Sequence, residues 1–387
     1  CRGTGTPTSS ESSPTAEATE TSSPTPESAE TPFAISAPFP EEAGEVDTLA
    51  PELMGITGWL NSEPLALEEL RGQVVLIDFW TYTCVNCIRT FPYLKEWHDK
   101  YSDNGLVIIG VHSPEFEFEK KAENVVRAIE HHGLGWPVAQ DNDFETWMAF
   151  NNHFWPAKYL LDEHGVIRYR HFGEGAYDET ERNIRGLLEE AGYDVSHISI
   201  NPDPGPRLDP QARGGVATGQ TRELYAGLTR NRFSQVPYLG NPEYYTTSPG
   251  TVTLYEDPGN HINHLFYLHG IWTNGDESII HARETEELED YIALKFYGTS
   301  VNVVINFEGG DPFRVDITLD GDPLPVFFRG ADIVRSEDGS TFIEVNEARM
   351  YNLVQSPEYG GRELRLSSNS DRFSVFAFTF GSYDTGP

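Results

Sequence analysis

Cys84 and Cys87, two cysteines separated by two residues, have the spacing in this sequence that most directly indicates chemistry. They follow the apolar run RGQVVLIDFW (71–80), which predicts a strand buried on both faces, and they open a segment with helical periodicity. A thiolate at the N-terminus of a helix faces unpaired N–H groups and the positive end of the helix dipole, which lower its pKa. The spacing also places both sulfurs on one helix face. The pattern predicts a redox-active pair in which Cys84 is the nucleophile and Cys87 resolves the mixed disulfide.

Other uses of a close cysteine pair fit this sequence less well. A zinc site needs two further ligands, and the sequence has no second CxxC and no HxxxH. Haem attachment needs a histidine after the second cysteine, where Ile88 stands. A structural disulfide across so short a loop would constrain the unfolded chain little. We therefore expect no metal, and no cofactor besides the redox-active Cys84–Cys87 disulfide.

Composition limits the class of function. The 387 residues suffice for two or three domains, and the formal charge of −34 argues against a nucleic-acid-binding protein, which needs a basic surface. No run of residues is long and apolar enough to span a bilayer.

The first 50 residues, rich in Ser, Thr, Pro and Glu, predict a disordered tether. Cys1 at the head of such a tract is typical of a bacterial lipoprotein after signal cleavage. We expect lipid attachment at Cys1 and an extracytoplasmic protein anchored to the bacterial cell membrane; the alternative is a chain that happens to begin at a cysteine.

The elements that must position the cysteines fall into two domains. Residues 51–195 predict a thioredoxin-like α/β domain, with strand, helix, strand, helix, an antiparallel hairpin and a last helix in that order. A Pro- and Gly-rich linker, 196–221, follows. Residues 222–387 predict an all-β, jelly-roll-like sandwich, because runs with period two recur between turn residues. These runs are 251–255, 264–272, 291–298, 300–307, 313–320, 342–345, 363–368 and 372–380.

The segment VVLIDFWTYTCVNCIRTFPYL resembles the active-site segment of thioredoxin-like proteins. The resemblance implies that Asp78 is a buried proton acceptor for Cys87 and that Pro92 lies inside the active-site helix. It also implies a cis-proline at Pro156, and a substrate-binding surface formed by Trp80, Trp155 and Pro156.

The wider tract WLNSEPLALEELRGQVVLIDFW resembles the membrane-tethered TlpA/ResA branch of these proteins. The stretches GVHSPEFEFEK, NNHFWPAKYLLDEHG and HFGEGAYDETE are more similar to the extracytoplasmic part of DipZ-type proteins. In those proteins a thioredoxin-like domain precedes a β-sandwich resembling a carbohydrate-binding module, and TRELYAGLTRNRF (221–233) resembles the beginning of that second domain. DipZ-type proteins have a membrane domain where this sequence has a polar tract. The resemblance therefore implies client proteins with disulfides and a membrane electron donor of the CcdA or DsbD type acting in trans.

Other residues give weaker indications of function. Glu115, Glu174 and His112 lie in segments similar to the family's, and an acid at Glu174 would tune Cys87 if its loop approached the cysteines. Carbohydrate is a further candidate partner, since the second domain is rich in tyrosine and contains Trp272.

We expect an extracytoplasmic thiol–disulfide oxidoreductase that reduces client disulfides, with cytochrome c maturation as one setting. An oxidase or isomerase would use the same two cysteines. Thr81 and Cys84 also have the Thr-x-x-Cys spacing of a peroxiredoxin-like peroxidase, but Ile77 stands where that class has a proline. The non-enzymatic alternative is a glycan-binding surface protein.

Overall fold

The computed structural model describes residues 44–200 and 219–382 of the chain. Cys1, most of the predicted tether and residues 201–218 of the predicted linker lie outside these ranges. Among the helices of the described ranges, none has the length and apolar character needed to cross a membrane.

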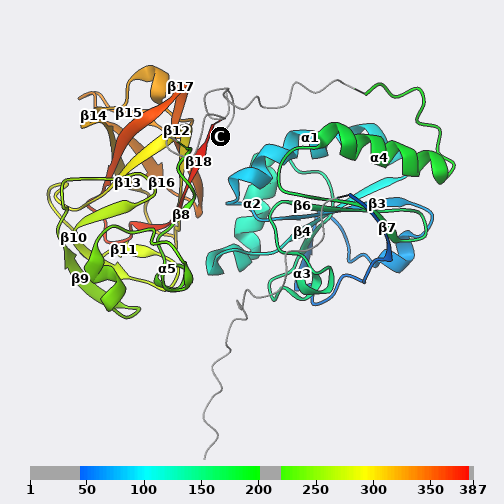
Figure 1. Cartoon of the computed structure of the whole chain (residues 1–387), viewed down its shortest axis with the longest axis horizontal. Coiled ribbons are helices and arrows are strands. Elements are labelled where there is room, and N and C mark those ends of the chain that lie inside the picture. Colours follow the sequence, from blue (N-terminus) through cyan, green and yellow to red (C-terminus); the bar gives the residue numbers. More distant parts are fainter. Residues whose placement is uncertain (1–43, 201–218, 383–387) are drawn as a thin grey trace, which may run out of the picture. The chain divides into compact units, whose positions relative to one another are not determined.

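The first domain (Figure 1) contains a sheet with helices packed against it. The sheet has seven strands in the order β1-β7-β6-β3-β4-β5-β2. The central strand β3 is parallel to β4 and antiparallel to β6. The strands are β1 (Gly44–Leu49), β2 (Gly58–Leu60), β3 (Val74–Trp80), β4 (Leu106–His112), β5 (Val138–Gln140), β6 (Ala157–Leu161) and β7 (Val166–Phe172).

Helices cover both faces of this sheet, which explains why β3 is apolar throughout. Leu76 belongs to a core cluster that also contains residues of α1 (Val85–Tyr101), α2 (Ala122–His132) and α4 (Tyr177–Glu190). Its neighbour Ile77 belongs to a second cluster, packed by α3 (Glu145–Ala149) and the 3-10 turn η1 (Leu67–Leu70). Alternate side chains of a strand point to opposite faces, so Asp78 shares the face that α1 covers. The 3-10 turns η2 (Ser102–Asn104) and η3 (Glu117–Lys120) complete the domain.

The predicted thioredoxin-like domain is confirmed, with one difference at its start. Strand β1 occupies residues assigned to the tether and pairs antiparallel with β7. Its sequence, GEVDTL, has no strong apolar pattern. The strand forms because the edge of β7 offers backbone hydrogen-bonding groups that a neighbouring chain segment satisfies.

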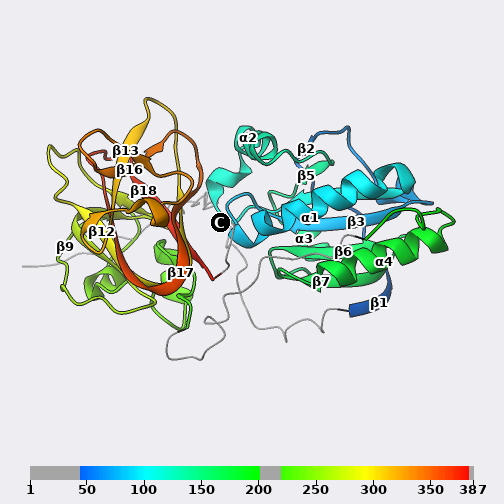
Figure 2. The same ribbon diagram turned by 90° about the horizontal axis from the view of Figure 1, so that it is seen from above.

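The second domain is β-rich, as predicted, and its strands form one hydrogen-bonded sheet wrapped around a separate core. Strands β12 and β17 are long and pair with each other along most of their length, and the C-terminal half of β12 also pairs with β18. Figure 2 shows the strong curvature of β17. The elements are β8 (Leu224–Tyr225), α5 (Leu228–Phe233), η4 (Pro242–Thr246), β9 (Thr251–Tyr255), β10 (Phe266–Asn274), β11 (Ile279–His281), β12 (Tyr291–Ile305), β13 (Phe313–Leu319), β14 (Asp322–Pro323), η5 (Val326–Phe328), β15 (Val334–Arg335), β16 (Thr341–Val345), β17 (Arg349–Ser367) and β18 (Ser374–Gly381).

Two predicted strands are one in the structure. The run 291–298 and all but the last two residues of the run 300–307 belong to the continuous strand β12, whose register with β17 shifts between Gly298 and Ser300. A bulge lets a strand bend without ending, and the sequence pattern at such a point is the same as at a turn. The N-terminal half of β17 was not predicted, because its residues do not alternate between apolar and polar types.

The two domains share one stretch of hydrophobic core. Phe376 of β18 lies among the rings of Phe116 and Phe118 from the first domain, with ring centroids 5.2 and 4.8 Å away. Beside them, Glu115 Oε1 accepts hydrogen bonds from the Tyr225 hydroxyl (2.9 Å) and from Arg230 (2.8 Å). The loop after β4 is thus fastened to the second domain by both apolar and charged contacts.

Candidate active site

The cysteine pair lies at the junction between β3 and α1. Cys84 is the N-cap residue of α1, and its sulfur accepts a hydrogen bond from the Cys87 backbone N–H at 3.2 Å. The two sulfurs are 2.6 Å apart. Cys84 is partly exposed, whereas Cys87 is completely buried. The geometry matches the predicted roles, with an accessible outer nucleophile and a shielded inner thiol that reaches only its neighbour.

The environment of Cys87 keeps its thiol protonated. Burial raises the pKa of Cys87 well above its usual value, and the neighbouring Cys84 sulfur and the Asp78 carboxylate raise it further. A thiol in this state needs a base before it can attack a disulfide.

Asp78 is the buried acid predicted for this role. Strand pairing places it opposite Lys158 of β6, and its Oδ1 lies 3.6 Å from Lys158 Nζ. Both side chains are only 1% exposed. Burial raises the pKa of Asp78 to about 6, while the positive charge of Lys158 opposes this shift. Sequence reasoning missed Lys158, although a charged residue inside the apolar strand AKYLL was a visible signal.

Pro156 has the predicted cis peptide bond with Trp155. The register of β6 against β3 pairs Ala157 with Phe79, so Pro156 lies at the end of β3 from which the chain runs to Cys84. Trp155 is partly exposed, and its indole N–H donates to the Ser113 carbonyl at 3.0 Å. This hydrogen bond holds the residue before the cis-proline against the loop that follows β4.

Trp80 does not take the predicted substrate-binding position. Its side chain is 1% exposed and packs edge-on against Phe91 and His112, with ring centroids 5.4 and 5.0 Å away. An indole buried on all sides cannot contact a client protein, so the prediction for Trp80 is wrong and its role is packing under α1.

Glu174 approaches the active-site helix but not Cys87 itself. Its carboxylate pairs with Arg89 at 3.2 Å, and Arg89 also donates to the Asn86 side chain at 3.4 Å. No hydrogen bond or ion pair in the described part of the chain joins Glu174 to Cys87, so the predicted tuning of Cys87 by Glu174 is not supported by a direct interaction. The contact that exists ties the loop after β7 to the first turns of α1, and Pro92 lies within that helix as predicted.

Sequence reasoning also missed a buried carboxylate beside the residue that precedes Cys84. Glu119 is completely buried, and its Oε1 accepts a hydrogen bond from Thr83 Oγ1 at 2.6 Å. Its Oε2 accepts from the backbone N–H groups of Glu115 (2.5 Å) and Phe116 (3.0 Å). Burial raises the pKa of Glu119 to about 7. The available indication was that Glu119 lies four residues after Glu115, at helical spacing, in the segment GVHSPEFEFEK.

His112 has a structural position. Burial lowers its pKa to about 3, so the ring is neutral at neutral pH, and its Nε2 lies 3.3 Å from Thr81 Oγ1. Its ring stacks on Tyr82 with centroids 5.7 Å apart. Both contacts hold the turn that leads to Cys84.

Two family models match the chain. The Redoxin model matches residues 46–188, and the model described as a thioredoxin-like C-terminal domain matches residues 221–381. These ranges coincide with the two domains of the structure.

Curated relatives point the same way. Protein DipZ of Mycobacterium tuberculosis is 36% identical over 283 residues, which are 72% of this chain and 37% of DipZ, so the chain spans little more than a third of that relative. The thiol-disulfide oxidoreductase YkuV of Bacillus subtilis is 32% identical over 36% of this chain and 94% of its own length. The thiol-disulfide oxidoreductase ResA of Halalkalibacterium halodurans is 31% identical over 34% of this chain and 69% of its own length.

Proposed function

Because this chain belongs to the thioredoxin-like thiol–disulfide oxidoreductases, we propose that it reduces disulfides of client proteins through Cys84 and Cys87. One observation supports this most strongly: the buried Cys87 thiol, with its raised pKa, lies against the partly exposed Cys84 and within the electrostatic reach of Asp78. That arrangement suits a two-step exchange in which only one sulfur meets the client.

The first step is an attack by the Cys84 thiolate on one sulfur of the client disulfide. The Cys84–client S–S bond forms, the client S–S bond breaks, and the departing client sulfur takes up a proton. In the second step Cys87 attacks the Cys84 sulfur and releases the other client thiol. The Cys87 proton passes to Asp78, whose pKa of about 6 makes it ionised and competent as a base at neutral pH. The client gains two electrons, and the protein is left with the Cys84–Cys87 disulfide.

Trapping variants test this assignment. Cys87→Ser is expected to accumulate a mixed disulfide with a client peptide, because the second step has no sulfur to perform it. Cys84→Ser is expected to form no adduct and to reduce nothing. Adducts of equal yield in the two variants, measured by intact mass, would remove Cys84 from the nucleophile's role.

The direction of electron flow is tested by the reduction potential of the pair. A value close to that of thioredoxin, about −270 mV, supports a reductase, whereas a value close to about −120 mV indicates an oxidase. Equilibration against glutathione buffers, followed by thiol alkylation and mass analysis, gives this number.

The setting of the reaction is a further part of the proposal. We place the protein outside the cytoplasm, with lipid on Cys1, no cofactor beyond the cysteine pair, and electrons from a membrane donor of the CcdA or DsbD type. Apocytochrome c thiols are one client class consistent with it. Mass analysis of the N-terminal peptide from the native host, together with the redox state of Cys84 after loss of such a donor, tests both points.

Two alternatives have less support. A peroxiredoxin-like peroxidase would use the hydroxyl of Thr81 at peroxide, but Thr81 is completely buried and lies against His112. Glycan binding would use exposed aromatic rings, but Trp272 is completely buried against Phe373. A hollow of about 400 Å³ on the second domain has Asp316, Glu363 and Arg365 in its lining and no aromatic residue. A glycan array tests the carbohydrate proposal.

A further inference from the structure

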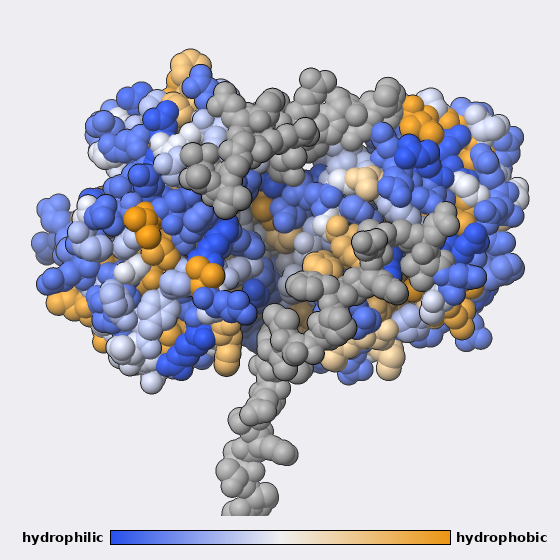
Figure 3. Space-filling view, in the orientation of Figure 1, coloured by the Kyte–Doolittle hydropathy of each residue, from blue (hydrophilic) through white to orange (hydrophobic). Residues whose placement is uncertain are grey.

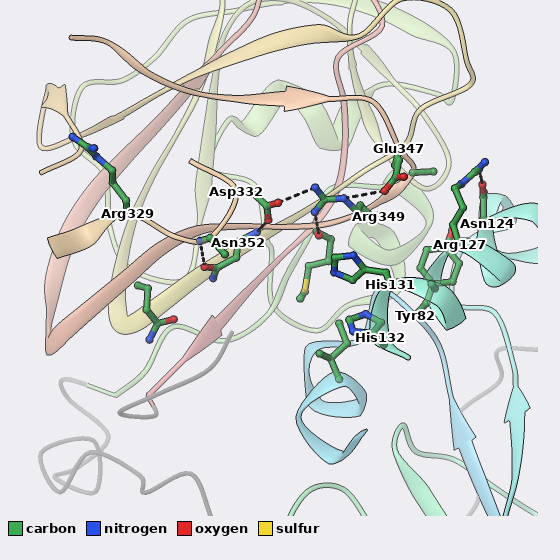
Figure 4. A pocket seen from close by; sticks show the side chains of 16 residues that line it. Tyr82, Asn124, Arg127, His131, His132, Arg329, Asp332, Glu347, Arg349 and Asn352 are labelled. Carbon is green, nitrogen blue, oxygen red and sulfur yellow. Dashed lines mark hydrogen bonds and ion pairs between the residues drawn. The ribbon is translucent and has the colours of Figure 1, made fainter. Parts of the chain in front are cut away.

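A cavity of about 560 Å³ lies between the two domains, directly beside the active-site turn (Figure 4). Tyr82 and Ile88 form part of its wall from the first domain. Tyr82 is two residues before Cys84, and Ile88 is about one helical turn after it. The opposite wall comes from β17 and the residues that precede it. The cavity therefore adjoins the segment that carries Cys84 on both sides of that residue.

The charge of the cavity is opposite to that of the chain. Three arginines line it, Arg127, Arg329 and Arg349. Arg349 forms ion pairs with both acidic residues of the lining, Asp332 (2.8 Å) and Glu347 (3.4 Å). In the described ranges the other two have no acidic partner, since Arg127 donates to the Asn124 side chain and Arg329 to the Leu324 carbonyl.

His132 adds no positive charge to the cavity. His132 also lines the cavity, and burial lowers its pKa to about 4, so that it is neutral at neutral pH. The lining holds three guanidinium groups against two carboxylates, Asp332 and Glu347. This net charge of +1, in a chain of net charge −34, singles out the cavity as a place for carboxylates.

The arrangement of the charges selects an extended occupant. Figure 4 shows Arg127 and Arg329 at opposite ends of the cavity lining, with Arg349 between them. The turn η5, which leads directly into Arg329, exposes two apolar side chains, Val326 (63%) and Phe327 (76%). Exposed apolar groups beside a charged groove favour a polypeptide, which offers side chains to both. A small anion would use neither the length of the cavity nor the apolar side chains of η5.

We propose that this cavity holds an acidic segment of the client polypeptide, next to the cysteine whose disulfide Cys84 attacks. The inference rests on the proposed reductase function and specifies its clients. Carboxylates of the segment pair with Arg127 and Arg329 before exchange, so the cavity contributes to client affinity and not to the chemistry of the sulfurs.

Single-turnover reduction of model peptides by the prereduced full-length chain tests the proposal. Three peptide disulfides are identical except for flanking residues that are all Glu, all Gln or all Lys. We expect the Glu peptide to react at least tenfold faster than the Lys peptide, measured as the second-order rate constant at low salt. The double variant Arg127→Gln/Arg329→Gln is expected to bring this ratio close to one.

A matched double variant controls for net charge. Arg182→Gln/Arg335→Gln removes two exposed arginines outside the cavity lining and is expected to keep the Glu preference. If wild type reduces all three peptides at equal rates, the cavity proposal fails and the reductase proposal stands. If no peptide is reduced, the reductase proposal itself fails. An equal preference for a small dicarboxylate disulfide over its neutral analogue would make the occupant a small anion and overturn the polypeptide assignment.

Discussion

Asp78 and Lys158 form a buried ion pair behind the cysteines, with Oδ1 and Nζ 3.6 Å apart and each side chain 1% exposed. Adjacent antiparallel strands place the two residues directly opposite each other, so the pair is fixed by sheet register. Burial raises the pKa of the Asp78 carboxyl, and the positive charge of Lys158 limits this rise. The pair thereby sets the pH at which Asp78, the base proposed for Cys87, becomes ionised.

Replacing Asp78 by asparagine is expected to slow the second exchange step by about a hundredfold, because a buried amide cannot accept the Cys87 proton. In wild type the rate of mixed-disulfide resolution should rise with pH through about 6, as Asp78 loses its proton. This rise should be absent in Asp78→Asn. Rapid-quench measurement of mixed-disulfide decay checks both points, with the exposed Asp99→Asn as control. A wild-type pH profile in Asp78→Asn would assign the proton to another acceptor.

Removing the charge of Lys158 is expected to shift the same profile to higher pH. In Lys158→Met the Asp78 carboxyl loses the positive charge that lowers its pKa, and the midpoint should rise above about 6 by about one unit or more. The exposed Lys121→Met should leave the midpoint in place. A midpoint that moves downward in Lys158→Met would contradict the assignment of the titration to Asp78.

Glu119 predicts a pH-dependent stability that is independent of the cysteines. Its folded-state pKa of about 7 lies above the ordinary value of 4.5, so ionisation is costlier in the folded protein than in the unfolded chain. The stability associated with protonated Glu119 is complete below about pH 4.5 and is lost as the pH rises through about 7. The loss amounts to roughly 3 kcal/mol at 1.36 kcal/mol per pKa unit.

The variant Glu119→Gln has no such charge. The difference in the free energy of unfolding between Glu119→Gln and wild type should therefore shift in favour of the variant as the pH rises from 5 to 8. Urea denaturation at both pH values measures the difference. Glu123→Gln, at an exposed position of α2, should show no change of this kind. A constant offset between Glu119→Gln and wild type at all pH values would mean that Glu119 is ionised at its ordinary pKa.

The aromatic contact between the domains predicts a large stability effect. Phe376→Ala empties the space between Phe116 and Phe118 and is expected to cost about 3–5 kcal/mol in the free energy of unfolding. Phe233→Ala, at a residue that is 82% exposed, should cost almost nothing. Denaturation followed by tryptophan fluorescence makes the comparison. Equal small losses for both variants would show that the interface does not support the fold.

The hydrophilic character of the surface can be predicted from the composition of the chain. Figure 3 shows a face dominated by hydrophilic residues with scattered hydrophobic ones, as expected for a chain with 61 acidic and 27 basic residues. Composition did not predict the local reversal of charge at Arg127 and Arg329. These residues come from α2 and from the turn after η5, about 200 positions apart, and only packing of the two domains joins them in one cavity.

By itself, the sequence determined the cysteine pair, the buried strand before it, the helix after it, and the two-domain order. These depend on residue type and short-range periodicity, which local sequence contains. Only the tertiary structure decided that Trp80 is buried, that Glu174 pairs with Arg89, and that Lys158 faces Asp78. Each of these depends on strand register or loop packing between residues far apart in the chain. The physical reason is that burial and ion pairing are properties of neighbours in space, and the sequence names only neighbours along the chain.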